Sequence, residues 1–398
     1  MQNRKILMTR LSIGVALSMA LIACNSSGSA VAENGESEKT SITPVDGPPF
    51  RMDEIADFDQ PWAMTFLPDG RLLVTEMDGR LKLVTLGEAT PIIALVQGTP
   101  EVDRGGQGGF GDVVLAPDFS ESGMVYLSWV EAGDDDVRGA VVGRAKLNLD
   151  EEAGPRLEGL KIIWRQDPKV TGRGHFSHRI AFSPDGEYLF IGSGERQKFD
   201  PAQDMSGNLG KIVRLKPDGS VPDDNPFADK GGVTAQIWSL GHRNILGLAF
   251  DGQGRLWNQE MGPKGGDELN LVIKGKNYGY PVVSNGDHYD GTDIPDHDTR
   301  PEFEAPKMFW NPSISPAGLM VYSGTAFPQW QGNIFIGALS GKALVRVTVD
   351  GDTAKEADRF DMKMRIREVE QGPDGSIWLL ADGQRGSDGQ LFRLSPNG

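Results

Sequence analysis

Residues 179–195 read "RIAFSPDGEYLFIGSGE", two apolar runs joined by a short turn that contains Pro, Asp and Gly. A tight turn of this composition between two apolar runs predicts an antiparallel β-hairpin. The same unit recurs five more times, as AMTFLPDGRLLVTE (63–76), DVVLAPDFSESGMVYLSW (112–129), LGLAFDGQGRLWNQE (246–260), GLMVYSGTAFPQWQGNIFIGAL (318–339) and VEQGPDGSIWLLAD (369–382). The sequence is therefore built from repeated hairpins, and helical periodicity is almost absent beyond its N-terminal segment.

The turns of these six units lie 43 to 78 residues apart and are centred on Gly70, Phe119, Gly186, Gly254, Gly332 and Gly375. Repeats of this length, each forming one antiparallel sheet, are typical of propeller blades. A β-sandwich would show turn signals every ~8–12 residues without the longer period. We therefore expect an all-β fold, a six-bladed β-propeller with four-stranded antiparallel blades.

The N-terminal segment has the features of an export signal. Three cations, Arg4, Lys5 and Arg10, are followed by the apolar stretch LSIGVALSMALIA, which ends at Cys24. This pattern predicts a lipoprotein signal peptide over 1–23, a flexible tether over 24–47 from a lipidated Cys24, and a propeller catalytic domain over 48–398. Asn25 resembles the residue after the cysteine in outer-membrane lipoproteins, so we expect a lipid anchor on the periplasmic side of that membrane. The alternative is an ordinary secretory signal, with the protein free in the periplasm.

Composition narrows the classes of partner. Without residues 1–23 the chain keeps 37 Lys and Arg against 56 Asp and Glu, a net charge near −19. Such a charge argues against nucleic acid as a partner and against binding to an anionic membrane surface. Cys24 is the only cysteine, so an intrachain disulfide cannot form.

A propeller brings one end of every hairpin to a common mouth, because the first strand of each blade starts on the face where its second strand ends. We expect a site there. The residues at these positions include several cations, which indicates a multiply anionic ligand. They are Gln107, His175, Arg243, Asn244, Ser313, Arg365 and Arg367 before the first strands, and Glu195, Arg196, Gly262, Pro263, Lys342 and Asp382 after the second strands.

The segment MGPKGGDELNLVIKGKNYGYP (261–281) suggests metal binding. Gly262 and Pro263 offer backbone carbonyls to a hard cation, and Asp267, Glu268 and the Tyr278 carbonyl offer oxygen atoms to a second one. Ligation by oxygen alone suits Ca²⁺. No His or Cys cluster has the spacing of a zinc site.

Several motifs together resemble a known family. GGQGGFGDVVLAPDF (105–119), GHFSHRIAFSPDG (174–186), SLGHRNILGLAFD (239–251) and MRIREVEQGPDG (364–375) are similar to motifs of the soluble glucose dehydrogenase/aldose sugar dehydrogenase family. Members are six-bladed propellers that use pyrroloquinoline quinone (PQQ), and the resemblance covers roughly residues 55–396. PQQ carries three carboxylates and an ortho-quinone, so it is an anionic ligand of the expected kind.

The resemblance implies roles for the residues at the mouth. His175 would be the base that takes the proton from the sugar C1 hydroxyl as hydride passes to the quinone. Gln107 would hold a quinone oxygen, and Arg243 would stabilise negative charge there. The other residues implied to contact the cofactor are Asn244, Ser313, Lys342, Arg365 and Arg367, and Asp382 would orient an arginine. Gly262 and Pro263 would bind a Ca²⁺ at the cofactor. Glu268 and the Tyr278 carbonyl would bind a second, structural Ca²⁺. An aldose would be the substrate, and the electron acceptor is not identified.

The chain also departs from the family pattern. The glucose enzymes have an Asp directly before the catalytic His, where this sequence has Gly174, and a Gln where it has the run Gly194-Glu195-Arg196. The family lysine aligns nearer Ser340 than Lys342. The sequence resembles the broad-specificity aldose branch more than the glucose enzymes, so a preference for glucose does not follow.

Two other functions fit parts of the pattern. A Ca²⁺-dependent lactonase-type hydrolase would need several carboxylates around one ion, whereas the mouth supplies arginine and histidine. A catalytically silent sugar- or cofactor-binding lipoprotein would need no oriented base. The loop at 284–306 is expected to be a solvated acidic loop, with the border of a substrate cleft as the alternative.

Overall fold

The protein is described from a computed structural model that defines residues 47–87, 90–150, 152–383 and 388–397. The expected signal peptide and all of the expected tether except Gly47 lie outside these residues. Within them, no helix combines the length and apolar character needed to cross a membrane.

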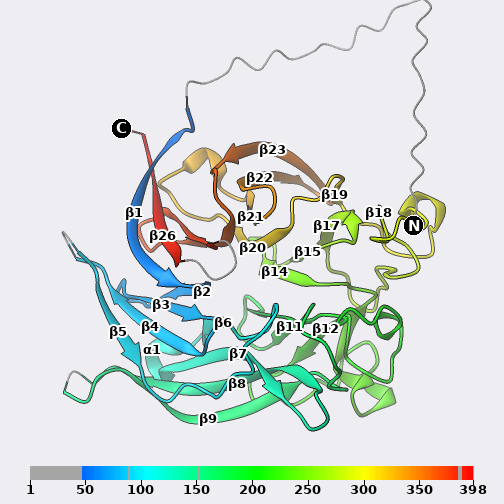
Figure 1. Ribbon diagram of the computed structural model, residues 1–398, viewed down its shortest axis with the longest axis horizontal. Helices are drawn as coiled ribbons and strands as arrows, with labels where there is room; N and C mark the ends of the chain where they lie inside the picture. Colours follow the sequence, from blue (N-terminus) through cyan, green and yellow to red (C-terminus); the bar gives the residue numbers. More distant parts are fainter. Residues whose placement is uncertain (1–46, 88–89, 151, 384–387, 398) are drawn as a thin grey trace, which may run out of the picture. The chain divides into compact units, whose positions relative to one another are not determined.

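The described residues form six four-stranded antiparallel sheets (Figure 1). Blade 1 consists of β2 (Pro61–Phe66), β3 (Leu72–Glu76), β4 (Arg80–Thr85) and β5 (Ile92–Val96). Blade 2 consists of β6 (Phe110–Leu115), β7 (Met124–Ala132), β8 (Arg138–Asn148) and β9 (Arg156–Arg165). Blade 3 consists of β10 (Ser177–Phe182), β11 (Leu189–Ser193), β12 (Lys211–Leu215) and β13 (Ile237–Leu240). Blade 4 consists of β14 (Ile245–Phe250), β15 (Leu256–Glu260), β17 (Asp267–Leu271) and β19 (Met308–Trp310). Blade 5 consists of β20 (Pro316–Val321), β21 (Ile334–Ala338), β22 (Ala343–Asp350) and β23 (Thr353–Asp361). Blade 6 consists of β24 (Ile366–Gln371), β25 (Ile377–Ala381), β26 (Asp388–Pro396) and β1 (Phe50–Asp59).

The remaining elements are short and lie in the connections. They are β16 (Lys264–Gly265) paired with β18 (Gly286–Asp287), α1 (Phe119–Ser122), and the 3₁₀ turns Asp200–Ala202, Ala228–Lys230, Thr234–Gln236, His297–Thr299 and Pro328–Trp330.

The first strands of the blades, β2, β6, β10, β14, β20 and β24, contact one another in that order, and β24 returns to β2. This closed circle confirms the six-bladed propeller. Each repeated turn of the sequence joins the first and second strands of one blade, as predicted.

The ring is closed by a strand from the other end of the chain. The first strand of the chain, β1, pairs antiparallel with the last, β26, from Phe50 opposite Pro396 to Asp59 opposite Asp388 (Figure 1). Blade 6 therefore contains three strands from the C-terminal end and one from the N-terminal end.

Burial explains the strand sequences. All five residues of β3 and all five of β25 are buried, because inner strands are covered by neighbouring blades on both faces. β25 is accordingly a continuous apolar run, IWLLA, and β3, LLVTE, is apolar up to its polar end at Thr75 and Glu76. The outer strand β23, TAKEADRFD, alternates exposed and half-buried residues because only one of its faces is covered.

The channel inside the ring contains a buried ionic cluster. Arg179 of β10 pairs with Asp112 of β6 (3.3 Å) and with Glu368 of β24 (2.5 Å). Its Nε donates to the carbonyl of Leu246 in β14 at 2.8 Å. One guanidinium thus links four blades. Burial raises the pKa of Asp112, and it raises the pKa of Glu368 to about 7.

Candidate active site

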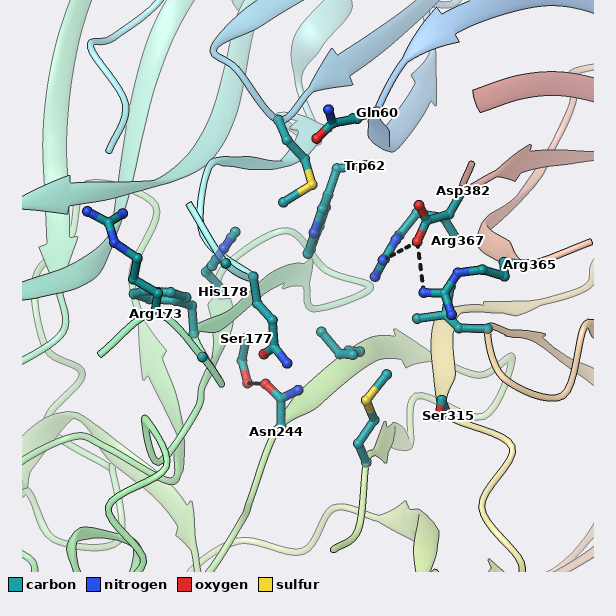
Figure 2. Close-up of a pocket in the computed structure, with 18 of the residues that line it drawn as sticks. Gln60, Trp62, Arg173, Ser177, His178, Asn244, Ser315, Arg365, Arg367 and Asp382 are labelled. Atoms are coloured by element: carbon teal, nitrogen blue, oxygen red, sulfur yellow. Dashed lines mark hydrogen bonds and ion pairs between the residues drawn. The ribbon is translucent and has the colours of Figure 1, made fainter. Parts of the chain in front are cut away.

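A cavity of about 1230 Å³ opens at the mouth of the propeller (Figure 2). All six blades or the loops that lead into them contribute to it, as expected from the convergence of their ends. Six of the predicted residues line it: Gln107, Asn244, Lys342, Arg365, Arg367 and Asp382.

The lining carries an excess of positive charge. Among the described residues, its charged side chains are five cations, Arg104, Arg173, Lys342, Arg365 and Arg367, and one carboxylate, Asp382. Asp382 Oδ2 accepts hydrogen bonds from both Arg365 Nη2 (3.1 Å) and Arg367 Nη2, which lie on the same side of the cavity (Figure 2). One acid therefore positions two arginines without neutralising them, so the cavity suits a polyanion.

His175 lies beside this cavity and is held on two sides. Its Nδ1 is hydrogen-bonded to Oε1 of Glu195, and its backbone N–H donates to Oε1 of Gln107 at 2.7 Å. Glu195 Oε2 accepts the backbone N–H groups of Lys198 (2.5 Å) and Phe199 (2.8 Å). Because Nδ1 donates to the carboxylate, Nε2 is the basic nitrogen of the ring.

Two opposing effects set the protonation of His175. Burial lowers its pKa, and the hydrogen bond to Glu195 raises it, with a net lowering. The imidazole is therefore neutral at neutral pH and available to accept a proton. Glu195 supplies the carboxylate that Gly174, in the position of the family Asp, cannot supply.

Arg196, next to Glu195, braces the segment that carries His175. Its buried guanidinium donates to the carbonyls of Gly174 (2.9 Å), Arg138 (2.6 Å) and Gly172 (2.6 Å). It also lies 3.7 Å above the ring of Phe176. Burial lowers the pKa of Arg196 to about 10, so it remains a cation at neutral pH. These contacts stabilise His175 in its positive-φ conformation (φ 48°).

The neighbouring blade repeats the Glu–His arrangement. Glu260 at the end of β15 is hydrogen-bonded to His242 Nδ1 (2.8 Å), and it accepts the backbone N–H of Arg243 (2.5 Å). His242 is completely buried and stacks on Tyr278 with 4.6 Å between ring centroids. This second pair is structural, and it fixes the backbone of Arg243.

Asn244 lines the cavity, whereas Arg243 is buried next to it and is not among the described lining residues. Arg243 Nη1 donates to the carbonyls of Met261 (2.9 Å) and Gly262 (2.5 Å). Asn244 Oδ1 accepts a hydrogen bond from Ser177 at 3.2 Å (Figure 2). The Gly262 carbonyl thus already accepts a hydrogen bond from a cation, and the Ca²⁺ expected on the carbonyl oxygens of Gly262 and Pro263 stays a prediction.

The residues expected at a second Ca²⁺ are buried and hydrogen-bonded. Glu268 accepts from Asn270 Nδ2 (3.1 Å) and lies 3.3 Å from His297 Nε2, while Asn270 Oδ1 is buried without a partner. These oxygen atoms are of the type Ca²⁺ prefers, and this site stays a prediction. Within the described parts of the chain, no three His, Cys, Asp or Glu side chains are grouped so that they alone would bind a metal.

Asp267 holds the segment that contains Ser313 through hydrogen bonds. Asp267 Oδ2 accepts the Ser313 hydroxyl (2.6 Å) and the backbone N–H groups of Ile314 and Ser315 (2.8 Å each). The cavity is lined by Ser315 and Ser340, which are hydrogen-bonded to each other at 2.7 Å. The role of Ser313 at the cofactor stays a prediction, and its hydroxyl is engaged with Asp267.

Sequence reasoning missed the contribution of blade 1. Gln60 and Trp62 line the cavity, and Trp62 stacks on His178 with 5.1 Å between ring centroids. His178 contacts Ser128 at 2.7 Å, and burial lowers its pKa to about 3, so it stays neutral. The signal was present in "DQPWAMTF" (59–66), whose polar start precedes a first strand like the others.

The fold and the site define a six-bladed propeller enzyme with a carboxylate-supported histidine beside a cation-lined cavity. The model of the family described as glucose/sorbosone dehydrogenase matches residues 58–393. The chain therefore belongs to the glucose/sorbosone dehydrogenase family and is an oxidoreductase.

Individual relatives agree with this assignment. The aldose sugar dehydrogenase YliI of Escherichia coli strain K12 is 41% identical over 346 residues, which are 85% of this chain and 90% of that protein. The apo-form crystal structure of the soluble aldose sugar dehydrogenase from Escherichia coli has a TM-score of 0.80 and 40% identity, covering 87% of this chain and 100% of that one. The PQQ-bound aldose sugar dehydrogenase from Streptomyces coelicolor has a TM-score of 0.70 and 26% identity, covering 88% of this chain and 100% of that one.

Proposed function

We propose that the protein oxidises aldose sugars at C1 to lactones, with PQQ as cofactor, Ca²⁺ beside it and His175 as general base. The observation that carries the proposal is the His175–Glu195 pair beside a cavity to which the described part of the chain contributes five cations and one carboxylate. A tricarboxylate matches that charge. The family and the PQQ-bound relative support the same chemistry.

The residues that would hold the cofactor lie on several blades. Arg365, Arg367 and Lys342 would pair with its carboxylates, and Gln107 and Asn244 would hydrogen-bond its polar edge. When bound, PQQ with its Ca²⁺ supplies an acceptor for the hydride that leaves C1. The carbonyls of Gly262 and Pro263 would hold that Ca²⁺.

The protein itself moves the proton and orients the sugar. His175 Nε2 accepts the proton of the C1 hydroxyl, while the Glu195 carboxylate stabilises the imidazolium that forms. Arg243 would supply positive charge to stabilise the negative charge that develops on the hydride acceptor. Loss of the hydroxyl proton and of the C1 hydride leaves a double bond between C1 and its oxygen, which is the carbonyl of the lactone.

Three further predictions from the sequence stay proposals. We propose a lipid anchor at Cys24, a position on the periplasmic side of the outer membrane, and a second Ca²⁺ at Glu268 and the Tyr278 carbonyl. The electron acceptor that reoxidises the cofactor is unidentified.

Reconstitution tests the function. Adding PQQ and Ca²⁺ to the apoprotein should allow an aldose to reduce an artificial dye acceptor, and omission of any one of these components should abolish the reaction. Lactone hydrolysis with Ca²⁺ alone would support the hydrolase instead. PQQ binding without dye reduction across a panel of aldoses would support the silent binder.

The pH profile of Glu195→Gln tests the orienting role of Glu195. The acid limb of kcat/KM should move to lower pH, because loss of the carboxylate leaves the effect of burial on the His175 pKa unopposed. The rate on the plateau should fall roughly 10- to 100-fold, as for other carboxylates that orient a histidine. Glu131→Gln is the matched control, since Glu131 lies in β7 and binds Arg165 and Lys169. An unshifted acid limb would exclude this role.

A further inference from the structure

A group of aromatic side chains borders Arg243 on the side of the loop at 284–306. The Arg243 guanidinium lies 5.7 Å from the ring centre of Tyr280 and 5.9 Å from that of Tyr289. Phe199 completes the group, 6.4 Å from the Tyr280 ring and 5.6 Å from the ring of His288. This loop is therefore more than a solvated acidic segment, because its tip contacts an active-site arginine.

The Glu195 carboxylate, which orients His175, also holds the backbone of Phe199. Its backbone N–H donates to Glu195 Oε2, and it has a positive φ of 63°. Such a conformation is uncommon for a bulky residue and persists only where neighbouring contacts enforce it. Phe199 is nevertheless 44% exposed, so this constrained backbone holds an apolar ring in solvent.

Tyr280 adds an unsatisfied hydroxyl. The residue is 5% exposed, and its buried Oη lies beside the Arg243 guanidinium, with no hydrogen-bond acceptor for its O–H among the described residues. A buried O–H donor without an acceptor is costly, which indicates a ligand acceptor atom at this position.

Tyr289 is the most exposed aromatic of the group, at 74%. An exposed aromatic ring beside a buried hydroxyl donor matches a ligand with one apolar face and a polar edge. A pyranose has this chemistry, since its axial C–H bonds form an apolar face and its hydroxyls form the rim.

We propose that Phe199, Tyr280 and Tyr289 form the subsite that holds the sugar ring beside His175. The rings of Phe199 and Tyr289 contact the C–H face, and the Tyr280 hydroxyl hydrogen-bonds a sugar hydroxyl other than that on C1. This inference rests on the proposed function for its ligand class. It assigns these three residues to sugar affinity and specificity, separate from cofactor binding.

The test uses the holoenzyme and measures binding apart from turnover. The probe is 1,5-anhydroglucitol, which lacks the C1 hydroxyl and cannot be oxidised there, with binding followed by ligand-observed NMR. Tyr289→Ala and Tyr280→Phe should each weaken probe binding about 5- to 10-fold. They should raise KM for glucose by a similar factor, leave kcat within twofold and leave PQQ affinity unchanged. Phe309→Ala is the matched control, since Phe309 is a 50% exposed aromatic in β19.

The outcomes separate this inference from the proposed function. Probe binding that both variants leave unchanged overturns the subsite, and so does a wild-type holoenzyme that does not bind the probe. A fall in kcat with unchanged KM and probe affinity also overturns it. If no aldose is oxidised but Tyr289→Ala still weakens probe binding, the subsite stands and the dehydrogenase proposal fails.

Discussion

His175→Ala is expected to lower kcat for aldose oxidation by about 10²- to 10⁴-fold while PQQ affinity stays close to that of the wild type. The range is that of a general base in proton transfer. His175 is 6% exposed and makes its side-chain hydrogen bond to Glu195, whereas the cations that would bind the cofactor come from other blades. Steady-state dye reduction gives kcat, and titration of the apoprotein with PQQ gives the affinity.

Chemical rescue makes this prediction specific. Added imidazole should restore part of the activity of His175→Ala, because the small base can occupy the space of the deleted ring. Circular dichroism checks that the propeller remains folded. An unchanged rate would refute the assignment of the base, and loss of PQQ binding in step with loss of activity would make His175 a cofactor ligand instead.

The second large effect is expected on stability. Arg179→Met should destabilise the propeller by about 3–5 kcal/mol, because it leaves the buried carboxyls of Asp112 and Glu368 without their partner. Urea unfolding followed by tryptophan fluorescence gives the difference. Arg51→Met is the control, since the Arg51 side chain is 66% exposed in its ion pair and should contribute no more than about 1 kcal/mol.

The pH dependence of Arg179→Met follows from the same cluster. The pKa of Glu368 is raised to about 7 in the folded protein, so folding favours its protonated form. Stability from such a group is complete below the unfolded pKa and is lost as pH rises through the folded value. Arg179 lowers this pKa, so its removal makes the ionised form of Glu368 still less favourable in the folded protein. The loss of unfolding free energy caused by Arg179→Met should therefore grow between pH 5 and pH 8. A defect that is the same at both values would show that the cluster is not ionic.

Most of the architecture could be predicted because it rests on local signals. Each first hairpin contains its own turn, so six copies are visible without knowledge of any contact. The strand β1 was not predicted, since its partner β26 lies at the other end of the chain and no turn connects the two. Pairing of this kind leaves no local pattern.

The site was predictable only where strand ends determine it. Gln107, Asn244 and Arg365 precede first strands, whereas Arg367, predicted at the same kind of position, is the second residue of β24; the ring brings all four together. Glu195 was noticed at the end of a strand, but its bond to His175 depends on positive-φ backbone at both ends of the hairpin. Tyr280 and Tyr289 were missed as site residues because the path of an irregular loop brings them to Arg243.

The pairing of β1 with β26 also sets the condition under which the ring can close. The strand that completes blade 6 comes first in the chain, and the three strands it joins come last. A chain with five finished blades still presents an open hydrogen-bonding edge, which invites non-native association. A chain that terminates before β26 lacks the partner of β1, so its ring cannot close.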